Sequence, residues 1–296
     1  MTDPTLASLP PTYVVVTPCR NEADHLDGTI DSMAAQSVRP AQWVIVNDGS
    51  TDETPEILAR AVDAYPWITV VDREDRGHRL NGSGVMHAVH DGLARLDIDN
   101  WDFMVKLDSD LTFDPQYFQQ CFEHFEADAT LGVGGGVVLS EVDGKLIEEK
   151  HPKFHVRGAT KIYRRACWDE IDGLHPVKGW DTLDELKANM EGWSTRSFED
   201  LAVVQKRYTG AAQGQLSNWR KNGEGCWIAG YHPLFLVARA IVRGFRRPYV
   251  TPTIGLMAGY FGAAARRTAR IPDPALIAYV RRQQFRKLTG RSSAWN

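Results

Sequence analysis

Two aspartates separated by a single serine follow an apolar run in the stretch MVKLDSDLTF, residues 104–113. In an extended segment, residues two apart point the same way, so the Asp108 and Asp110 carboxylates can converge on one point. Like charges this close repel each other unless a cation lies between them. Hard cations such as Mg²⁺ and Mn²⁺ bind one or two carboxylates together with phosphate oxygens and water. The stretch therefore predicts either a metal site or, because the pattern is common by chance, a solvated turn.

A second polar stretch, NDGSTDET, follows the apolar residues 43–46. Asn, Asp, Gly and Ser favour turns, so one interpretation is a turn between a strand and a helix, with Ser50 or Thr51 capping the helix. In the other interpretation, Asp48 accepts a hydrogen bond from a base or a ribose. This stretch alone does not decide between the two.

A third polar stretch, TPCRNEADHL, has the same ambiguity after the apolar residues 13–16. Arg20 and Glu22 can pair on the surface, and Asn21 can cap a helix. An arginine at a strand end also suits a diphosphate or carboxylate partner, because its planar guanidinium donates two parallel hydrogen bonds.

The elements that would position these stretches alternate between strands and helices. Apolar β-branched runs predict the strands, and apolar residues at helical spacing predict the helices between them. This alternation indicates an α/β fold with a mostly parallel central sheet and helices on both faces. Ligands bind such sheets beyond the carboxyl ends of the strands, where all three polar stretches fall. The expected strands are 13–17, the start of 43–50, 67–71, 104–107 and 133–142, and the expected helices are 26–33, 54–65 and 84–96.

Length and composition are those of a soluble globular protein. The 296 residues are 43% hydrophobic and 24% charged, enough for one large α/β domain or for two domains. The four cysteines are scattered without zinc-ligand spacing, which favours a reducing, cytosolic compartment. The first twelve residues lack a basic region followed by an apolar run, so no signal peptide is expected.

The charge is divided unevenly along the chain. Residues 226–296 contain twelve Lys and Arg and a single acidic residue, Asp273, which gives +11. The net charge of −4 then leaves −15 on residues 1–225. We therefore expect a domain over residues 1–225 and a basic C-terminal region over 226–296. No nucleic-acid motif accompanies the arginines, so an anionic membrane surface is the expected partner and nucleic acid is not.

Two segments of the C-terminal region have apolar character. In residues 231–249, one helical face is apolar and the other is basic, which is typical of an interfacial membrane helix or of a core helix with a solvated basic side. The apolar face comprises Leu234, Val237, Ile241 and Phe245, and the basic face comprises Arg239, Arg243, Arg246 and Arg247. Residues 248–265 carry no charge, but their prolines, glycines and alanines favour a shallow or re-entrant helix over a membrane span.

Together, TPCRNE, VIVNDGSTDET and VKLDSDLTF resemble the nucleotide-binding half of the inverting glycosyltransferases of family 2, which have the GT-A fold. The resemblance covers about residues 12–205, and its specific part is the order of NDGSTDET and DSD, about 60 residues apart. It implies transfer of a sugar from a nucleotide-diphosphate sugar, expected to be UDP-linked, to a hydroxyl of a lipid-linked or saccharide acceptor in surface polysaccharide assembly. It also implies Mn²⁺ or Mg²⁺ as cofactor and a place at the cytoplasmic face of the cell membrane.

The resemblance assigns expected roles to the acidic residues. Asp110 would be the metal ligand, and Asp108 would lie nearer the ribose or a metal-bound water and assist with the metal. Asp48 would bind the base, although Asn47 stands where the family usually has a first aspartate.

The remaining donor contacts come from two other segments. Pro18, Arg20 and Glu22 would border the nucleotide at the tip of the first strand. Arg79 and Asn81, in the loop RGHRLNGSG, would reach the diphosphate.

The family's general base is an aspartate that precedes a helix and a glycine–aromatic pair. Asp181, eleven residues before Gly192, has the expected spacing. Asp184 and Glu185 are alternatives that could equally be solvated charges on the helix. Glu199-Asp200 is a literal Glu-Asp match, but it follows the Gly-Trp pair.

One departure from the family concerns the metal. Gln205 stands where many relatives have a metal-binding histidine, so Asp110 and the phosphates would hold the metal alone, or bind it weakly. A non-catalytic nucleotide-sugar sensor at the membrane is therefore an alternative function. A sugar nucleotidyltransferase is another, although TPCRNEAD lacks the glycine-rich phosphate loop that this reaction favours.

Overall fold

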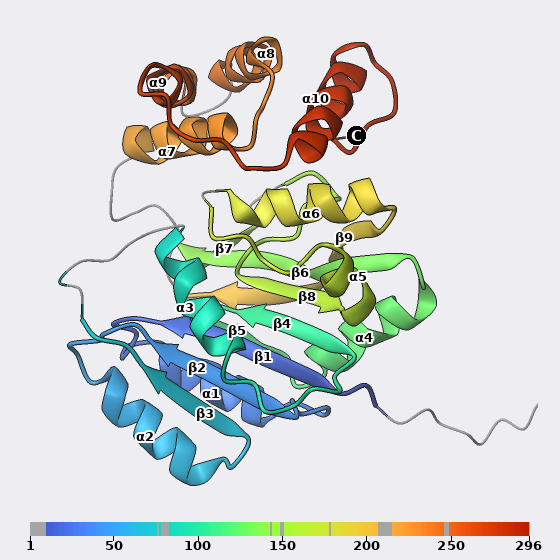
Figure 1. Cartoon of the computed structure of the whole chain (residues 1–296). Coiled ribbons are helices and arrows are strands. Elements are labelled where there is room, and N and C mark those ends of the chain that lie inside the picture. The colour runs from blue at the N-terminus through green and yellow to red at the C-terminus, as the bar shows by residue number, and fades with distance from the viewer. Residues whose placement is uncertain are drawn as a thin grey trace, which may run out of the picture.

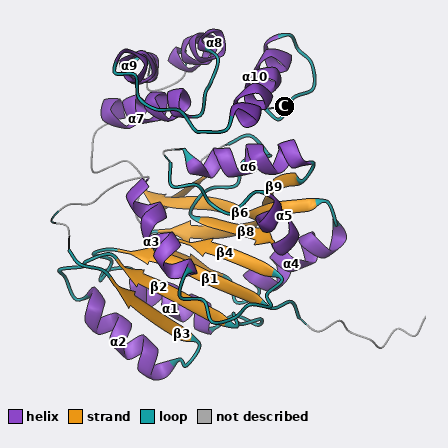
Figure 2. Ribbon diagram, viewed as in Figure 1, coloured by secondary structure: helices purple, strands orange, loops and turns teal. Residues whose placement is uncertain are grey.

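The computed structural model describes residues 10–75, 77, 83–142, 144–148, 151–177, 179–206, 215–245 and 249–295. Its centre is one curled β-sheet with helices on both faces, and a group of C-terminal helices lies beyond one of those layers (Figures 1 and 2). The arrangement is the α/β architecture that the alternation of strands and helices predicts.

Four parallel strands form the first half of the sheet, in the order β3-β2-β1-β4. They match the four strands predicted before residue 110. Their bounds are β1 (Tyr13–Cys19), β2 (Gln42–Asn47), β3 (Ile68–Asp72) and β4 (Phe103–Leu107). Cys19 pairs with Asn47, and Asn47 pairs with Asp72, so the carboxyl ends of β1, β2 and β3 meet at one edge.

The second half of the sheet is mixed. β8 (Thr160–Arg164) runs antiparallel to β4, and the order continues through β6 (Leu131–Val142), β9 (Ser194–Gln205) and β5 (Leu111–Phe113), while β7 (Lys145–Glu148) pairs with β6. Among these strands, only β6 is predicted by an apolar run in the sequence. The β5–β9 pairing sets Gln205 opposite Leu111, which places it beside Asp110.

Side chains that alternate along the strands pack into two cores. Tyr13 and Val15 pack on one face, beneath α1 (Leu26–Ala34), α2 (Thr54–Ala64) and α4 (Tyr117–Ala127). Val14 and Val16 pack on the other, beneath α3 (Ser83–Leu93), α5 (Arg165–Glu170) and α6 (Trp180–Glu191). Both faces of the parallel strands are therefore buried, as the continuous apolar runs of β1 and β2 require.

The C-terminal helices share a third core that includes Leu183 and Leu186 of α6. These helices are α7 (Gln215–Ile228), α8 (Pro233–Gly244), α9 (Thr251–Ala265) and α10 (Pro274–Leu288). Residue 225, after which the basic region is expected to begin, lies inside α7. Among the residues that the structure describes, no helix is both long enough and apolar enough to span a membrane.

Helix α9 packs closely on α7 because glycines line the contact. A Cβ atom on Gly259 would lie 1.9 Å from the backbone oxygen of Arg220, and one on Gly223 would lie 2.2 Å from that of Leu256. Any side chain at these positions would push the two helices apart.

Replacing Gly259 by alanine is expected to lower the free energy of unfolding by about 1–3 kcal/mol, because the added methyl group overlaps backbone that cannot yield. Gly262→Ala is the matched control on the same helix, since its Cβ would meet only the flexible end of Arg266, at 3.3 Å. There, higher helix propensity should leave stability unchanged or raise it by up to about 1 kcal/mol. Denaturant titration measures both, and equal effects would contradict the close α7–α9 contact.

Candidate active site

Arg20 ties together the ends of three strands. Its guanidinium donates a hydrogen bond to the backbone oxygen of Asp48, just after β2, and pairs with Asp75, after β3, at 2.6 Å. The Asp48 carboxylate accepts a hydrogen bond from Arg73 Nη1 at 2.7 Å. Pro18, the penultimate residue of β1, pairs with Val46 in the sheet. The structure thus brings Pro18, Arg20 and Asp48 to one edge, as predicted.

The polar turn after β1 is interlocked with the turn after β2. Asn21 adopts a left-handed conformation (φ 52°), and its side-chain oxygen accepts a hydrogen bond from Thr51 N at 2.8 Å. Ser50 Oγ accepts one from Asn21 N at 3.0 Å, and Thr54 Oγ1 accepts one from the backbone N of the buried Glu22 at 2.9 Å.

Two sequence-based alternatives are therefore wrong. Neither Ser50 nor Thr51 caps α2, whose N-cap is Glu53 without a side-chain hydrogen bond. Arg20 forms its ion pair with Asp75 and not with Glu22. Glu22 is buried and does not lie on the surface.

Asp108 has a cation of this chain beside it. Lys106, the penultimate residue of β4, is 2% exposed and forms an ion pair with Asp108 Oδ1. Its Nζ also donates to the backbone oxygen of Gly158 at 2.6 Å. Positive charge beside the Asp108 carboxylate therefore comes from a side chain, which neither the metal site nor the solvated turn expected from the sequence includes. The buried lysine in turn needs this partner.

Asp110 lies immediately before β5 and is buried. Gln205 Nε2 approaches its two carboxylate oxygens at 3.2 and 3.3 Å, and Lys206 N donates to its backbone oxygen at 3.0 Å. The predicted relation between Gln205 and Asp110 is therefore a direct contact, which the β5–β9 pairing creates.

The residues around Asp110 fit a cation that arrives with phosphate oxygens. In the part of the chain that the structure describes, no group of three or more His, Cys, Asp or Glu side chains could hold a metal ion. Mg²⁺ is commonly held by one or two carboxylates together with substrate phosphates. Asp110 and Asp108 can supply the carboxylates. A half-turn of the Gln205 amide would present its oxygen, another ligand that hard cations accept.

Asp181 lies in the first turn of α6, which begins after Gly179 in a left-handed conformation (φ 81°). The positive end of the helix dipole favours a carboxylate there. Within the described residues, the Asp181 side chain has no hydrogen-bond or ion-pair partner, and it is partly exposed. Its backbone oxygen accepts a hydrogen bond from Lys161 Nζ.

The two alternatives one turn along α6 are buried, so the expectation that they might be solvated is wrong. Asp184 and Glu185 both pair with Lys161 of β8 at 2.9 Å, and Glu185 also pairs with His155 Nδ1 at 2.8 Å. Tyr163 donates a hydrogen bond to Asp184. Their oxygens hold α6 on the sheet and are occupied by structural partners.

The pKa values in this cluster reflect burial opposed by charge. Burial raises the pKa of Asp184 to about 6, and Lys161 opposes the rise. Burial alone would lower the pKa of Lys161, but Asp184, Glu185 and Asp181 outweigh it and raise the pKa. For His155 as well, burial favours the neutral ring, yet Glu185 raises the pKa. Protonated His155 and Lys161 therefore offset the two carboxylates.

The Glu199-Asp200 pair lies elsewhere, on exposed positions of β9. Glu199 pairs with Lys153 at 3.1 Å, and Asp200 pairs with His124 of α4 at 3.0 Å. The His124 contact places Asp200 beside α4, which packs on the opposite face of the sheet from α6.

Trp180 connects the Asp108 end of β4 with α6. Lys106 Nζ and Lys161 Nζ each lie 5.5 Å from the centre of its ring. A Cβ atom on Gly158, whose oxygen binds Lys106, would lie 3.0 Å from the Trp180 ring and 3.3 Å from Asp181 Cβ. Asp108 and Asp181 are thus held by one shared set of contacts.

Sequence reasoning missed Lys106, Lys161, Trp180 and Arg73. The sequence does carry a signal for Lys106, because this lysine lies inside the apolar run MVKL. A lysine is almost never fully buried unless it is paired, so its place in this run indicates an acidic partner nearby. Arg79 and Asn81 lie outside the described residues.

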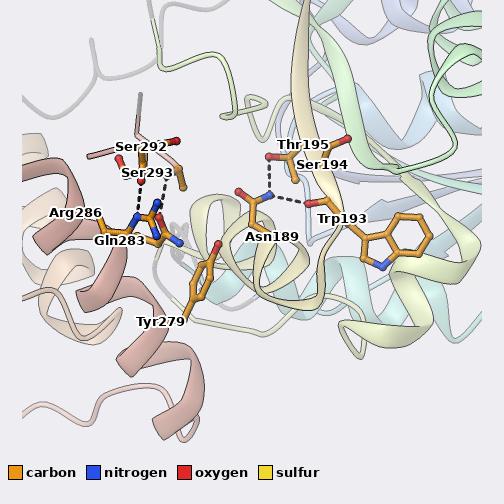
Figure 3. A pocket seen from close by; sticks show the side chains of 10 residues that line it. Asn189, Trp193, Ser194, Thr195, Tyr279, Gln283, Arg286, Ser292 and Ser293 are labelled. Carbon is orange, nitrogen blue, oxygen red and sulfur yellow. Dashed lines mark hydrogen bonds between the residues drawn. The ribbon is translucent and has the colours of Figure 1, made fainter. Parts of the chain in front are cut away.

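A pocket of about 430 Å³ lies at the other end of α6, between β9 and α10 (Figure 3). Asn189 donates to Trp193 O and Thr195 Oγ1, both at 3.2 Å, and Arg286 donates to Ser292 O at 2.5 Å. None of the predicted site residues lines this pocket, and these hydrogen bonds lie within α6 and β9 or within α10 and the residues after it.

Comparisons with known proteins show the family of this chain. The model of the family described as Glycosyl transferase family 2 matches residues 14–178, more than half of the chain. The chain is 27% identical over 118 residues to a poly-beta-1,6-N-acetyl-D-glucosamine synthase of Staphylococcus aureus (strain MSSA476), covering 40% of this chain and 26% of that protein. It is 23% identical over 191 residues to glycosyltransferase GlyA of Streptococcus pneumoniae serotype 4, and the match covers 63% of this chain and 25% of GlyA. The chain thus spans about a quarter of the length of these curated relatives.

Solved structures show the same fold. The mannosyltransferase PcManGT from Pyrobaculum calidifontis, in complex with GDP-Man and Mn²⁺, has a TM-score of 0.57 at 19% identity and covers 92% of this chain and 79% of that one. S. aureus TarS 1–349 in complex with UDP-GlcNAc has a TM-score of 0.52 at 18% identity, and the match covers 72% of this chain and 64% of the TarS chain. The predicted α/β fold of the GT-A type, with C-terminal helices, is confirmed.

Replacing His155 by glutamine is expected to flatten the pH dependence of stability. Because the pKa of His155 is raised in the folded chain, its contribution is complete below about pH 6.5 and is lost as the pH rises through the raised pKa. Denaturant titrations over a pH series measure this slope. His87→Gln, on the exposed side of α3, should keep the wild-type slope. An unchanged slope in His155→Gln would contradict the buried ion pair.

Proposed function

We propose, because the chain belongs to glycosyl transferase family 2, that it transfers one sugar from a nucleotide-diphosphate sugar to an acceptor hydroxyl with inversion of the anomeric centre. The observation that carries the proposal is the contact set of Lys106, Lys161 and Trp180. It holds Asp108, at the end of β4, and Asp181, at the start of α6, in one site.

Residues at the edge formed by β1 and β2 bind the donor nucleotide. Asp48 accepts a hydrogen bond from the base, and the Arg73 guanidinium orients its carboxylate. Pro18, Arg20 and Glu22 border the nucleotide, and Arg79 and Asn81 reach the diphosphate. The complexes of PcManGT with GDP-Man and of TarS with UDP-GlcNAc support a nucleotide sugar as donor, and we propose a UDP-linked one.

Asp110 and Asp108 hold the divalent cation, Mn²⁺ or Mg²⁺, together with the diphosphate. When bound, the cation stabilises the negative charge that develops on the leaving group. Lys106 orients the Asp108 carboxylate from the buried side. Gln205 fixes the carboxylate plane of Asp110 through its amide.

Asp181 is the general base. Its carboxylate takes the proton from the acceptor hydroxyl as the oxygen attacks the anomeric carbon in line. Lys161 fixes the first turn of α6 through the Asp181 backbone oxygen, which sets where the carboxylate lies. A single displacement from the side opposite the leaving diphosphate inverts the anomeric centre.

The acceptor is a hydroxyl of a lipid-linked or saccharide chain in surface polysaccharide assembly. The similarity to a poly-beta-1,6-N-acetyl-D-glucosamine synthase supports a saccharide acceptor. The charge of +11 on residues 226–296 supports contact with an anionic membrane, and we place the protein on the cytoplasmic face of the cell membrane.

Asp181→Asn is expected to lower the rate of transfer by about 10²–10⁴-fold while leaving donor affinity unchanged, because the amide cannot accept the proton. The measurements are acceptor-dependent release of nucleoside diphosphate and calorimetric donor binding. Asp200→Asn, which changes the alternative base, should retain transfer. Near-normal turnover by Asp181→Asn would refute the assignment.

Asp110→Ala is expected to weaken binding of nucleoside diphosphate in Mn²⁺ by about tenfold or more, about 1.4 kcal/mol, because a cation ligand is removed. Calorimetry with Mn²⁺ and with chelator separates the metal-dependent part. Asp114→Ala is the control and should bind as the wild type does, because its carboxylate accepts a local backbone hydrogen bond from Gln116 N at 2.8 Å. Equal wild-type affinity with and without Mn²⁺ would count against the metal site.

A further inference from the structure

Six large apolar side chains are exposed where α8 ends and α9 begins. We call this surface the α8–α9 tip; its exposed fractions are 51% for Ile241, 59% for Val242, 80% for Phe245, 59% for Tyr249, 58% for Val250 and 55% for Ile254. Hydrogen bonds join its two sides, from Thr253 Oγ1 to Ala240 O at 2.7 Å and from Val250 N to Gly244 O at 3.3 Å. The six side chains therefore belong to one surface.

The fold does not need these side chains for its core. Helix α8 buries Phe235, Leu236 and Ala240. Helix α9 buries its other face, including the glycines that contact α7. The apolar face expected in α8 is thus largely exposed: Leu234, Ile241 and Phe245 lie outside the core.

Val250 is also held in an unfavourable backbone conformation. Its φ of 64° lies in the left-handed region, where a β-branched residue is an outlier and glycine or asparagine would be less strained. Such positions cluster at functional surfaces. Here the consequence is an exposed valine between Tyr249 and α9.

The charge around the tip selects among partners. Arg243 lies on α8 between Val242 and Phe245, and Arg246 and Arg247 follow Phe245 in the sequence, although these two lie outside the described residues. The whole stretch 226–296 carries +11. Apolar and aromatic side chains next to several arginines complement the boundary between anionic headgroups and acyl chains.

We infer that the α8–α9 tip inserts into the headgroup region of an anionic bilayer. The inference deepens the proposed membrane contact and rests on that part of the proposed function. Helices α8 and α9 lie beyond α6 on the outer side of the molecule (Figure 1), so insertion would leave the sheet and its donor site in water. Contact is by a short tip, because no helix among the described residues could span the bilayer.

Phe245→Asp tests the tip against a matched phenylalanine. Binding to vesicles of phosphatidylcholine with phosphatidylglycerol should weaken by about tenfold or more, because one buried apolar side chain is lost and a negative charge is added. Phe285→Asp, on α10, makes the same charge change at a side chain that is 67% exposed, and it should bind much more tightly than Phe245→Asp. Ile241→Asp repeats the test at a second tip position.

A label distinguishes insertion from adsorption. The four native cysteines are buried, and burial raises the pKa of Cys167 to about 12, so a cysteine introduced at the surface can be labelled selectively. An environment-sensitive dye on Val242→Cys should shift to the blue on the mixed vesicles. The same dye on Leu146→Cys, which is 55% exposed on β7, should not shift.

Three results would overturn the inference: no vesicle binding by the wild type, equal binding by Phe245→Asp and the wild type, or lipid-free self-association that Phe245→Asp abolishes. The last would make the tip a contact between copies of this chain, which sedimentation measures. Nucleotide binding in lipid-free buffer should be the same for Phe245→Asp and the wild type. Failure of the donor proposal would therefore appear in that assay and leave vesicle binding intact.

Discussion

Two buried lysines on neighbouring strands constrain the site. Lys106 of β4 and Lys161 of β8 are direct partners in the antiparallel register, and their side chains are 2% and 0% exposed. Like charges in that position repel, and a buried ammonium group without a partner is strongly destabilising. The chain resolves this with carboxylates from two sides: Asp108 from the end of β4, and Asp184 with Glu185 from α6. Trp180 covers both ammonium groups.

Pairing with Lys161 gives the acidic residues of α6 different roles. Asp184 and Glu185 lie on the side of the helix that faces the sheet, where they neutralise Lys161 and His155. Asp181, one turn earlier, is held by its backbone oxygen, and its Cβ lies beside Gly158. Because the Gly158 backbone oxygen also accepts a hydrogen bond from Lys106, β4 and the first turn of α6 share contacts with Gly158. The geometry of the proposed base thus depends on residues that never touch substrate.

The parts of the fold that could be predicted from the sequence are those with a local signal. Strands β1 to β4 and helices α1 to α3 follow from apolar periodicity, and their polar ends follow from turn residues. Helix α4 has the same kind of signal in Tyr117, Cys121 and Phe125, spaced by four, although it was not predicted. The burial of Asp184 depends instead on Lys161, which no local pattern links to α6. Strand β9 likewise pairs with β5 and β6, and β8 pairs with β4, all more than fifty residues away in the chain.

The most direct test is a crystal of the protein with Mn²⁺ and a nucleoside diphosphate, with the metal located by its anomalous scattering. The account predicts an Mn²⁺ peak in direct contact with a carboxylate oxygen of Asp110 and with a diphosphate oxygen, with the base against Asp48. A metal bound away from Asp110, or a diphosphate bound away from the ends of β1, β2 and β4, would contradict it.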